Sequence, residues 1–165
     1  YPLPEAQLDR FLMQVNVSYP DAEAETRILK LARREASGTT PAPPQPLTQE
    51  AVFKARQAVL SVHMAEAVEA YIVQLVIATR EPGAYDNELS DWLEFGASPR
   101  ATIALDRCAR ANAYLHGRDY VSPDDVQAVV TDCLKHRLIL SFEAEAAGVT
   151  RAQVINRLLE TVAVG

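Results

Sequence analysis

The sequence predicts an all-α protein, a helical bundle of about five helices preceded by a short turn, one strand and one helix. Three observations support this fold class. Apolar residues recur at helical spacing through most of the chain after residue 47. Ser or Thr residues with typical helix-start neighbours precede several of these stretches. The composition, with 48% hydrophobic and 23% charged residues in 165, is that of a globular domain.

The first part of the chain has the pattern of an incomplete unit. Residues 4–11 favour a short helical turn with an acidic start. The stretch from Phe11 to Val17 is apolar and partly alternating, which predicts a strand. Since a lone strand leaves its backbone groups unpaired, this strand either pairs with something missing from the chain or hangs loosely. Residues 21–34 predict a helix with acidic residues in the first turn and basic residues in the last.

A proline-rich segment divides the chain. Four of the last six residues of the segment 35–46 are proline, which predicts an extended, semi-rigid linker. We therefore expect an incomplete first part at residues 1–34 and a complete second part at residues 47–165. The chain begins at Tyr1 without a methionine, so we expect it to be a piece of a longer protein.

The second part contains the predicted bundle. The strongest apolar stripe lies in residues 64–80, and Glu81-Pro82-Gly83 ends it. Trp92 and Phe95, in the loop that follows, are expected to cover the core, with a binding role for Trp92 as the alternative. Residues 137–141 are apolar enough for a short strand. The predicted helices are 49–61, 64–80, 99–116, one that Ser122 opens and one that Thr150 opens with Gln153 in a capping box.

The helix that begins after Gly96 is the candidate functional element. Ser98 is a good N-cap, and Pro99 suits the first helical position. Arg100 places a cation at the positive end of the helix dipole, which costs roughly 0.3–1 kcal/mol. Free amides and a guanidinium at one place favour binding of a phosphate or a carboxylate. The alternative is a surface arginine paired with a nearby acid, and Arg107 and Arg110, further along the helix, are expected to be solvated or paired in this way.

Composition and missing motifs exclude several classes of function. A net charge of −6 argues against binding to nucleic acid or to an anionic membrane surface. No predicted helix is rich in Lys or Arg, which also argues against a DNA-binding helix-turn-helix. No apolar run is long enough to span a bilayer. The two cysteines fall on apolar stripes, which favours a reducing cytoplasm, and the three histidines have no metal-ligand spacing, so no metal is expected. The chain contains no phosphate-binding loop.

Three segments carry a resemblance to a known family. They are residues 1–13 (YPLPEAQLDRFLM), residues 96–101 (GASPRA) and residues 117–126 (GRDYVSPDDV). In this order they resemble the C-terminal third of MoxR-family AAA+ ATPases, and the resemblance covers essentially the whole chain. It implies that residues 1–34 are the end of an α/β nucleotide-binding core and that residues 47–165 are the α-helical lid.

The resemblance also implies roles for two arginines. Arg10 matches the arginine finger, which reaches the γ-phosphate of ATP held by a neighbouring subunit; a salt bridge to Asp9 or Glu5 is the structural alternative. Arg100 matches the sensor-2 arginine, which contacts the nucleotide from the lid, with Ser98 and Pro99 shaping the helix start beside it.

The chain lacks the parts that such an ATPase holds upstream. The phosphate-binding loop and the acidic residues that hold Mg²⁺ are absent, so this piece alone is expected neither to hydrolyse ATP nor to bind it tightly. The resemblance implies a ring, typically a hexamer, that acts as a chaperone-like remodeller, often on proteins with von Willebrand factor A domains. The rival hypothesis is a stand-alone helical interaction module without nucleotide binding.

Overall fold

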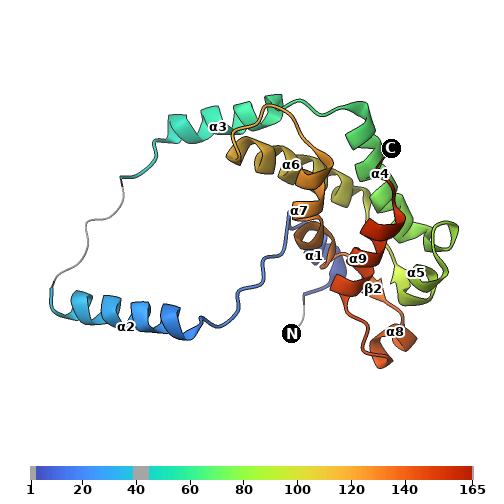
Figure 1. The fold of residues 1–165 in the computed structure, drawn as a ribbon, viewed down its shortest axis with the longest axis horizontal. Helices are drawn as coiled ribbons and strands as arrows, with labels where there is room; N and C mark the ends of the chain where they lie inside the picture. Colours follow the sequence, from blue (N-terminus) through green and yellow to red (C-terminus); the bar gives the residue numbers. More distant parts are fainter. Residues whose placement is uncertain (1–2, 39–44, 165) are drawn as a thin grey trace. The chain divides into compact units, whose positions relative to one another are not determined.

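The computed structural model describes residues 3–38 and 45–164 (Figure 1). The chain forms two units, one of residues 15–53 and one of residues 3–14 together with residues 54–164. The boundary between them falls inside α3 (Gln49–Ser61). Most of the proline-rich part of the predicted linker, residues 39–44, lies outside the described residues.

The smaller unit contains α2 (Ala22–Ala36), which ends two residues later than the predicted residue 34. The Asp21 side chain caps this helix by accepting a hydrogen bond from the Ala24 amide at 2.7 Å. Acidic residues lie in its first turn and basic residues in its last, the arrangement that complements the helix dipole. No residue of α2 is buried, so local capping and charge placement, rather than core packing, account for this helix.

The structure has no strand over residues 11–17, so the strand predicted from Phe11 to Val17 has no partner within this chain, one of the two outcomes expected for it. The backbone of its first half is bound in other ways. The Gln14 amide donates to the Asp132 carbonyl oxygen at 2.9 Å. The Phe11 and Leu12 carbonyl oxygens accept hydrogen bonds from a buried arginine side chain described below. These groups are therefore satisfied without a ladder partner.

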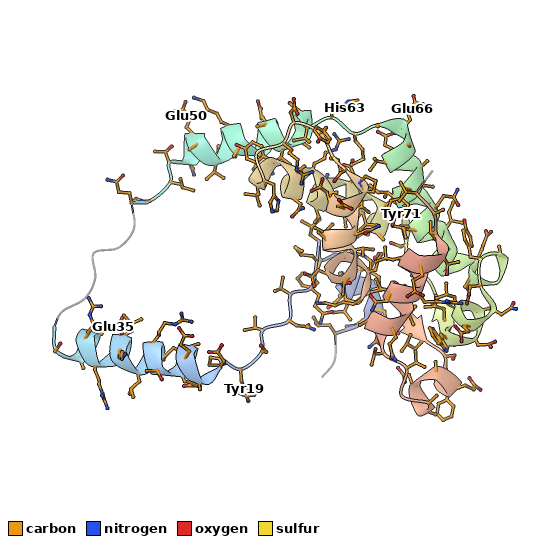
Figure 2. The ribbon with its side chains drawn as sticks, viewed as in Figure 1. Tyr19, Glu35, Glu50, His63, Glu66 and Tyr71 are labelled. Atoms are coloured by element: carbon orange, nitrogen blue, oxygen red, sulfur yellow. The ribbon has the colours of Figure 1, made fainter. Side chains whose placement is uncertain are left out.

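The larger unit is a helical bundle built from α4 (Glu66–Arg80), α6 (Pro99–Leu115), α7 (Pro123–Leu134) and α9 (Arg151–Thr161) (Figure 1). Alanines on the buried face of α6 let it lie close along α7. Tyr71 of α4, labelled in Figure 2, is 2% exposed and accepts a hydrogen bond from the Gln127 amide at its hydroxyl. The all-α class is confirmed. Fully buried side chains at its centre include Leu75, Leu105, Val126, Val130, Ile155 and Leu158.

Short elements connect the bundle helices: η1 (Pro82–Ala84), α5 (Asn87–Trp92) and α8 (Phe142–Ala146). A further short helix, α1 (Glu5–Leu8), precedes α2 near the start of the chain. The predicted strand in residues 137–141 is confirmed as β2 (Ile139–Leu140), which pairs antiparallel with β1 (Leu93–Phe95). Trp92 packs against the core as expected. Phe95 does not cover the core, because 59% of it is exposed.

The predicted helix ends are confirmed where the sequence marks them. Ser122 with Asp125, and Thr150 with Gln153, form capping boxes at α7 and α9. Gly117 has a φ of 72°, the left-handed conformation that ends α6 and that other residues rarely adopt.

Candidate functional site

The loop before α6 is fixed to the end of α4. A Cβ on Gly96 would lie 2.2 Å from the Thr79 carbonyl oxygen, so only glycine allows this approach. The Ala97 amide donates to the buried Thr79 hydroxyl at 2.9 Å, and Arg80 Nε donates to the Ala97 carbonyl oxygen at 2.7 Å. The α4 helix therefore determines where α6 begins.

Ser98 and Pro99 start α6 as predicted. The Ser98 hydroxyl accepts a hydrogen bond from the Arg100 amide at 3.1 Å, and Pro99 is the first helical residue. The same hydroxyl lies 2.8 Å from Asp9 Oδ2 and 3.0 Å from Oδ1, so it donates to this carboxylate. An internal anion, Asp9, thus lies near the positive end of α6.

The Arg100 side chain is half exposed and only loosely paired. Its Nε lies 3.8 Å from Asp9 Oδ2, and 53% of the side chain is exposed. An exposed pair at this separation contributes about 0–1 kcal/mol, because water screens it. The structure thus contains a weak form of the surface ion pair that the sequence left as the alternative, and the guanidinium stays open to an external anion.

Arg137, which the sequence analysis did not single out, holds the segment that contains Asp9. It follows α7, and its side chain is 2% exposed. Nε donates to Asp9 Oδ1 at 3.0 Å, and Nη2 donates to the carbonyl oxygens of Asp9 at 3.0 Å and Phe11 at 2.5 Å. Nη1 donates to the carbonyl oxygens of Leu12, at 3.3 Å, and Cys133. These contacts match the five N–H groups that a guanidinium carries.

His136 lies beside Arg137 against the same segment. Its Nε2 is 3.3 Å from the Phe11 carbonyl oxygen, to which it donates when that nitrogen carries the hydrogen. Its buried Nδ1 has no hydrogen-bond partner in the part of the chain that the structure describes. Burial and the charge of Arg137 both lower the pKa of His136, so the neutral ring is favoured at neutral pH.

Arg10 is exposed, and within residues 3–38 and 45–164 its side chain has no ion pair or hydrogen bond. The salt bridge to Asp9 or Glu5, the structural alternative from the sequence, does not form. The backbone on both sides of Arg10 is nevertheless held, because Arg137 binds the carbonyl oxygens of Asp9 and Phe11. The Arg10 guanidinium therefore extends from a fixed stretch of backbone.

The other arginines of α6 differ from Arg100. Arg110 pairs with Asp106 at 2.8 Å and donates to the Val62 carbonyl oxygen, so it is paired within the protein, as the sequence analysis expects. Arg107 is exposed. Among the described residues, no group of three or more His, Cys, Asp or Glu side chains is arranged to hold a metal ion. No helix there is long and apolar enough to cross a bilayer.

Sequence signals for Asp9 and Arg137 are weak. Arg137 lies between the apolar stripe of α7 and the apolar β2, a position that suggests a buried side chain. A buried arginine needs an acid or other acceptors as partners, so this position is the one available signal. Its partner Asp9 is 128 residues away, and no local pattern links the two positions.

Comparisons with known proteins show what this chain is similar to. Residues 89–158 match the AAA lid domain family. The chain is 41% identical over 99% of its length to Chaperone MoxR1 of Mycobacterium tuberculosis, of which it covers 42%. It is 33% identical over 98% of its length to Protein MoxR of Methylorubrum extorquens, of which it covers 49%. A crystal structure from Cytophaga hutchinsonii superposes with a TM-score of 0.92 at 40% identity, covering 100% of this chain and 50% of that one.

The chain thus spans less than half the length of these curated relatives. The family match covers α6 and α7, which carry the helix start at Ser98 and lead to Arg137. On this evidence the chain is similar along almost its whole length to the C-terminal portion of proteins of the MoxR family, and its residues 89–158 match the AAA lid domain.

Proposed function

We propose that this chain is the nucleotide-sensing part of a MoxR-like ATPase ring. Residues 1–34 complete an ATPase core, residues 35–46 are a linker and residues 47–165 form the lid. Arg100, with Ser98 and Pro99 at the helix start, acts as sensor 2 on the ATP of its own subunit. Arg10 acts as the arginine finger on the ATP of the neighbouring subunit, where it stabilises charge on the transferred phosphoryl group.

The observation that carries this proposal is the exposure of both guanidinium groups beside an acid that is bound elsewhere. Asp9 lies next to Arg10 in sequence and near Arg100 in space, yet its short contacts go to Ser98 and Arg137. Two cations are thereby left open to phosphate. In a structural ion pair each guanidinium would be bound to an acid of the protein itself, as Arg110 is bound to Asp106, and would not be available to phosphate.

The phosphate-binding loop and the Mg²⁺ ligands are proposed to belong to a preceding core segment. Mg²⁺ would neutralise phosphate charge there. Consistent with this division, we expect the 165-residue chain alone to have no ATPase activity and no tight ATP binding.

Arg100→Ala in the full-length protein tests the sensor role. We expect ATP affinity or turnover to fall about tenfold or more, because a charged contact to the nucleotide is lost. Arg107→Ala is the matched control, since Arg107 is an exposed arginine on the same helix. Equal behaviour of the two variants would contradict the assignment.

Mixing two variants tests whether Arg10 acts in trans. Arg10→Ala should lower kcat by about tenfold or more while leaving nucleotide binding intact. In an equimolar mixture with Arg100→Ala, about a quarter of the interfaces in a head-to-tail ring combine an intact Arg100 with a neighbour's intact Arg10. ATPase activity should therefore reappear on mixing, whereas a finger that acts within its own subunit gives no recovery.

The biological role is proposed by analogy with a relative named as a chaperone. We infer a cytoplasmic, ring-forming remodelling or assembly factor, a hexamer in the simplest case, with von Willebrand factor A domain proteins as partners. A stand-alone helical interaction module is the alternative. A full-length protein without a phosphate-binding loop, with both arginine variants fully functional, would favour it.

A further inference from the structure

We propose that Arg137 is a positioning residue that keeps the Asp9 carboxylate away from Arg100 and holds the backbone on which Arg10 is mounted. The inference rests on the proposed function, because it concerns how these two arginines are kept ready. It assigns one side chain two separable effects, one on nucleotide binding and one on turnover.

The first effect is electrostatic. Asp9 is the acid near the exposed Arg100, with 3.8 Å between Asp9 Oδ2 and Arg100 Nε. Its Oδ1 is bound by Arg137 Nε at 3.0 Å, and its Oδ2 by the Ser98 hydroxyl at 2.8 Å. Without Arg137 the carboxylate loses its buried cation and is free to close on Arg100. It would then compete with a nucleotide phosphate for the same guanidinium.

The second effect is mechanical. Arg137 binds the carbonyl oxygens of Asp9, Phe11 and Leu12, which surround Arg10 in sequence. It is anchored in turn on α7 through the Cys133 carbonyl oxygen. An arginine finger stabilises a transition state only when its guanidinium is held in place, since small displacements are costly in rate. Loss of Arg137 frees this backbone.

The two effects predict a split between nucleotide affinity and kcat. In the full-length protein, Arg137→Met should weaken the binding of a fluorescent ATP analogue about fivefold and lower kcat about tenfold. In the double variant Asp9→Asn/Arg137→Met the competing carboxylate is gone. Affinity should then return to within about twofold of wild type while kcat stays low.

Arg157→Met is the matched control. Arg157 also joins two segments of the bundle, binding Asp86 at 2.6 Å, but it lies outside the cluster around Asp9. We expect it to lower the melting temperature without changing affinity or kcat in the folded protein. Amide hydrogen exchange gives a readout independent of activity: the amides of Phe11 and Gln14, which bond to Leu8 and Asp132, should exchange faster in Arg137→Met and not in Arg157→Met.

Arg137→Lys serves if Arg137→Met fails to fold. Lysine keeps a cation beside Asp9 but lacks the guanidinium geometry that reaches four carbonyl oxygens. Affinity should stay within about twofold of wild type and kcat should fall about tenfold.

The outcomes separate this inference from the proposed function. The inference is wrong if Arg137→Met behaves like Arg157→Met, or if Asp9→Asn restores no affinity to Arg137→Met. If Arg10→Ala and Arg100→Ala leave ATPase activity unchanged, the proposed function itself fails, whatever the Arg137 variants do.

Discussion

Replacing Gly96 by alanine is the sharpest test of how the site is built. The added Cβ would lie 2.2 Å from the Thr79 carbonyl oxygen, 2.4 Å from the Thr79 carbonyl carbon and 2.7 Å from the Arg80 nitrogen. Ordinary contact begins at 3.4 Å, so the loop and the end of α4 must separate by about 1.2 Å. The obstacle is backbone at the end of a packed helix, which cannot rotate away as a side chain can.

The separation also threatens two hydrogen bonds. The Ala97 amide bond to Thr79 and the Arg80 bond to the Ala97 carbonyl oxygen both cross this contact. Overpacking costs about 1–3 kcal/mol, and each hydrogen bond contributes about 0.5–1.5 kcal/mol, or somewhat more with a charged donor. We expect Gly96→Ala to lower the free energy of unfolding by ~3 kcal/mol.

Urea unfolding followed by circular dichroism measures this loss. Gly83→Ala is the matched control, because its Cβ would meet nothing closer than the Ser90 hydroxyl oxygen at 3.4 Å. We expect it to change stability by less than about 0.5 kcal/mol. If the two variants unfold at the same urea concentration, the loop is not held against α4 and the argument for a fixed α6 start is refuted.

Three further changes probe the bundle, each measured by urea or thermal unfolding. Burial raises the pKa of Asp125, but hydrogen bonds from Arg118, Ser122 and Asn112 outweigh this effect and hold the pKa well below its usual range. The Asp125 carboxylate therefore stabilises the fold above about pH 4, and this contribution is lost as the pH falls further. Asp125→Asn should therefore cost about 3 kcal/mol at pH 7 and flatten the stability profile below pH 4, unlike Asp124→Asn at an exposed site. Thr150→Ala removes the cap of α9 and should cost about 1 kcal/mol, against no change for the exposed Asn156→Ala. Ala109→Leu, at a position with 0% exposure, should cost about 1–3 kcal/mol, whereas Ala128→Leu on the exposed side of α7 should be nearly neutral.

Predictions from the sequence succeeded where the interacting groups are neighbours in the chain. The cap at Ser98, the proline after it and the left-handed Gly117 follow from contacts within a few residues, and the structure contains all three. The roles of Arg10 and Arg100 stay predictions, although the structure leaves both side chains exposed as those roles require.

The strand predicted at Phe11–Val17 does not form within this chain, for a physical reason. Alternating apolar residues show that a segment favours an extended backbone, but a strand also needs a neighbour to complete its hydrogen bonds. Here part of that need is met by Arg137, His136 and the Asp132 carbonyl oxygen. A side chain more than a hundred residues away thus binds backbone groups that a neighbouring strand would otherwise pair.

The sequence by itself determined the helices, their ends and the position of a cation at the start of α6, because capping, dipole and periodicity act over one or two turns. Only the tertiary structure decided that Asp9 lies between Ser98 and Arg137 and that Gly96 sits against the backbone of Thr79. Those contacts join residues brought together by burial of the common core, and no local rule encodes which distant partner a buried charge will find.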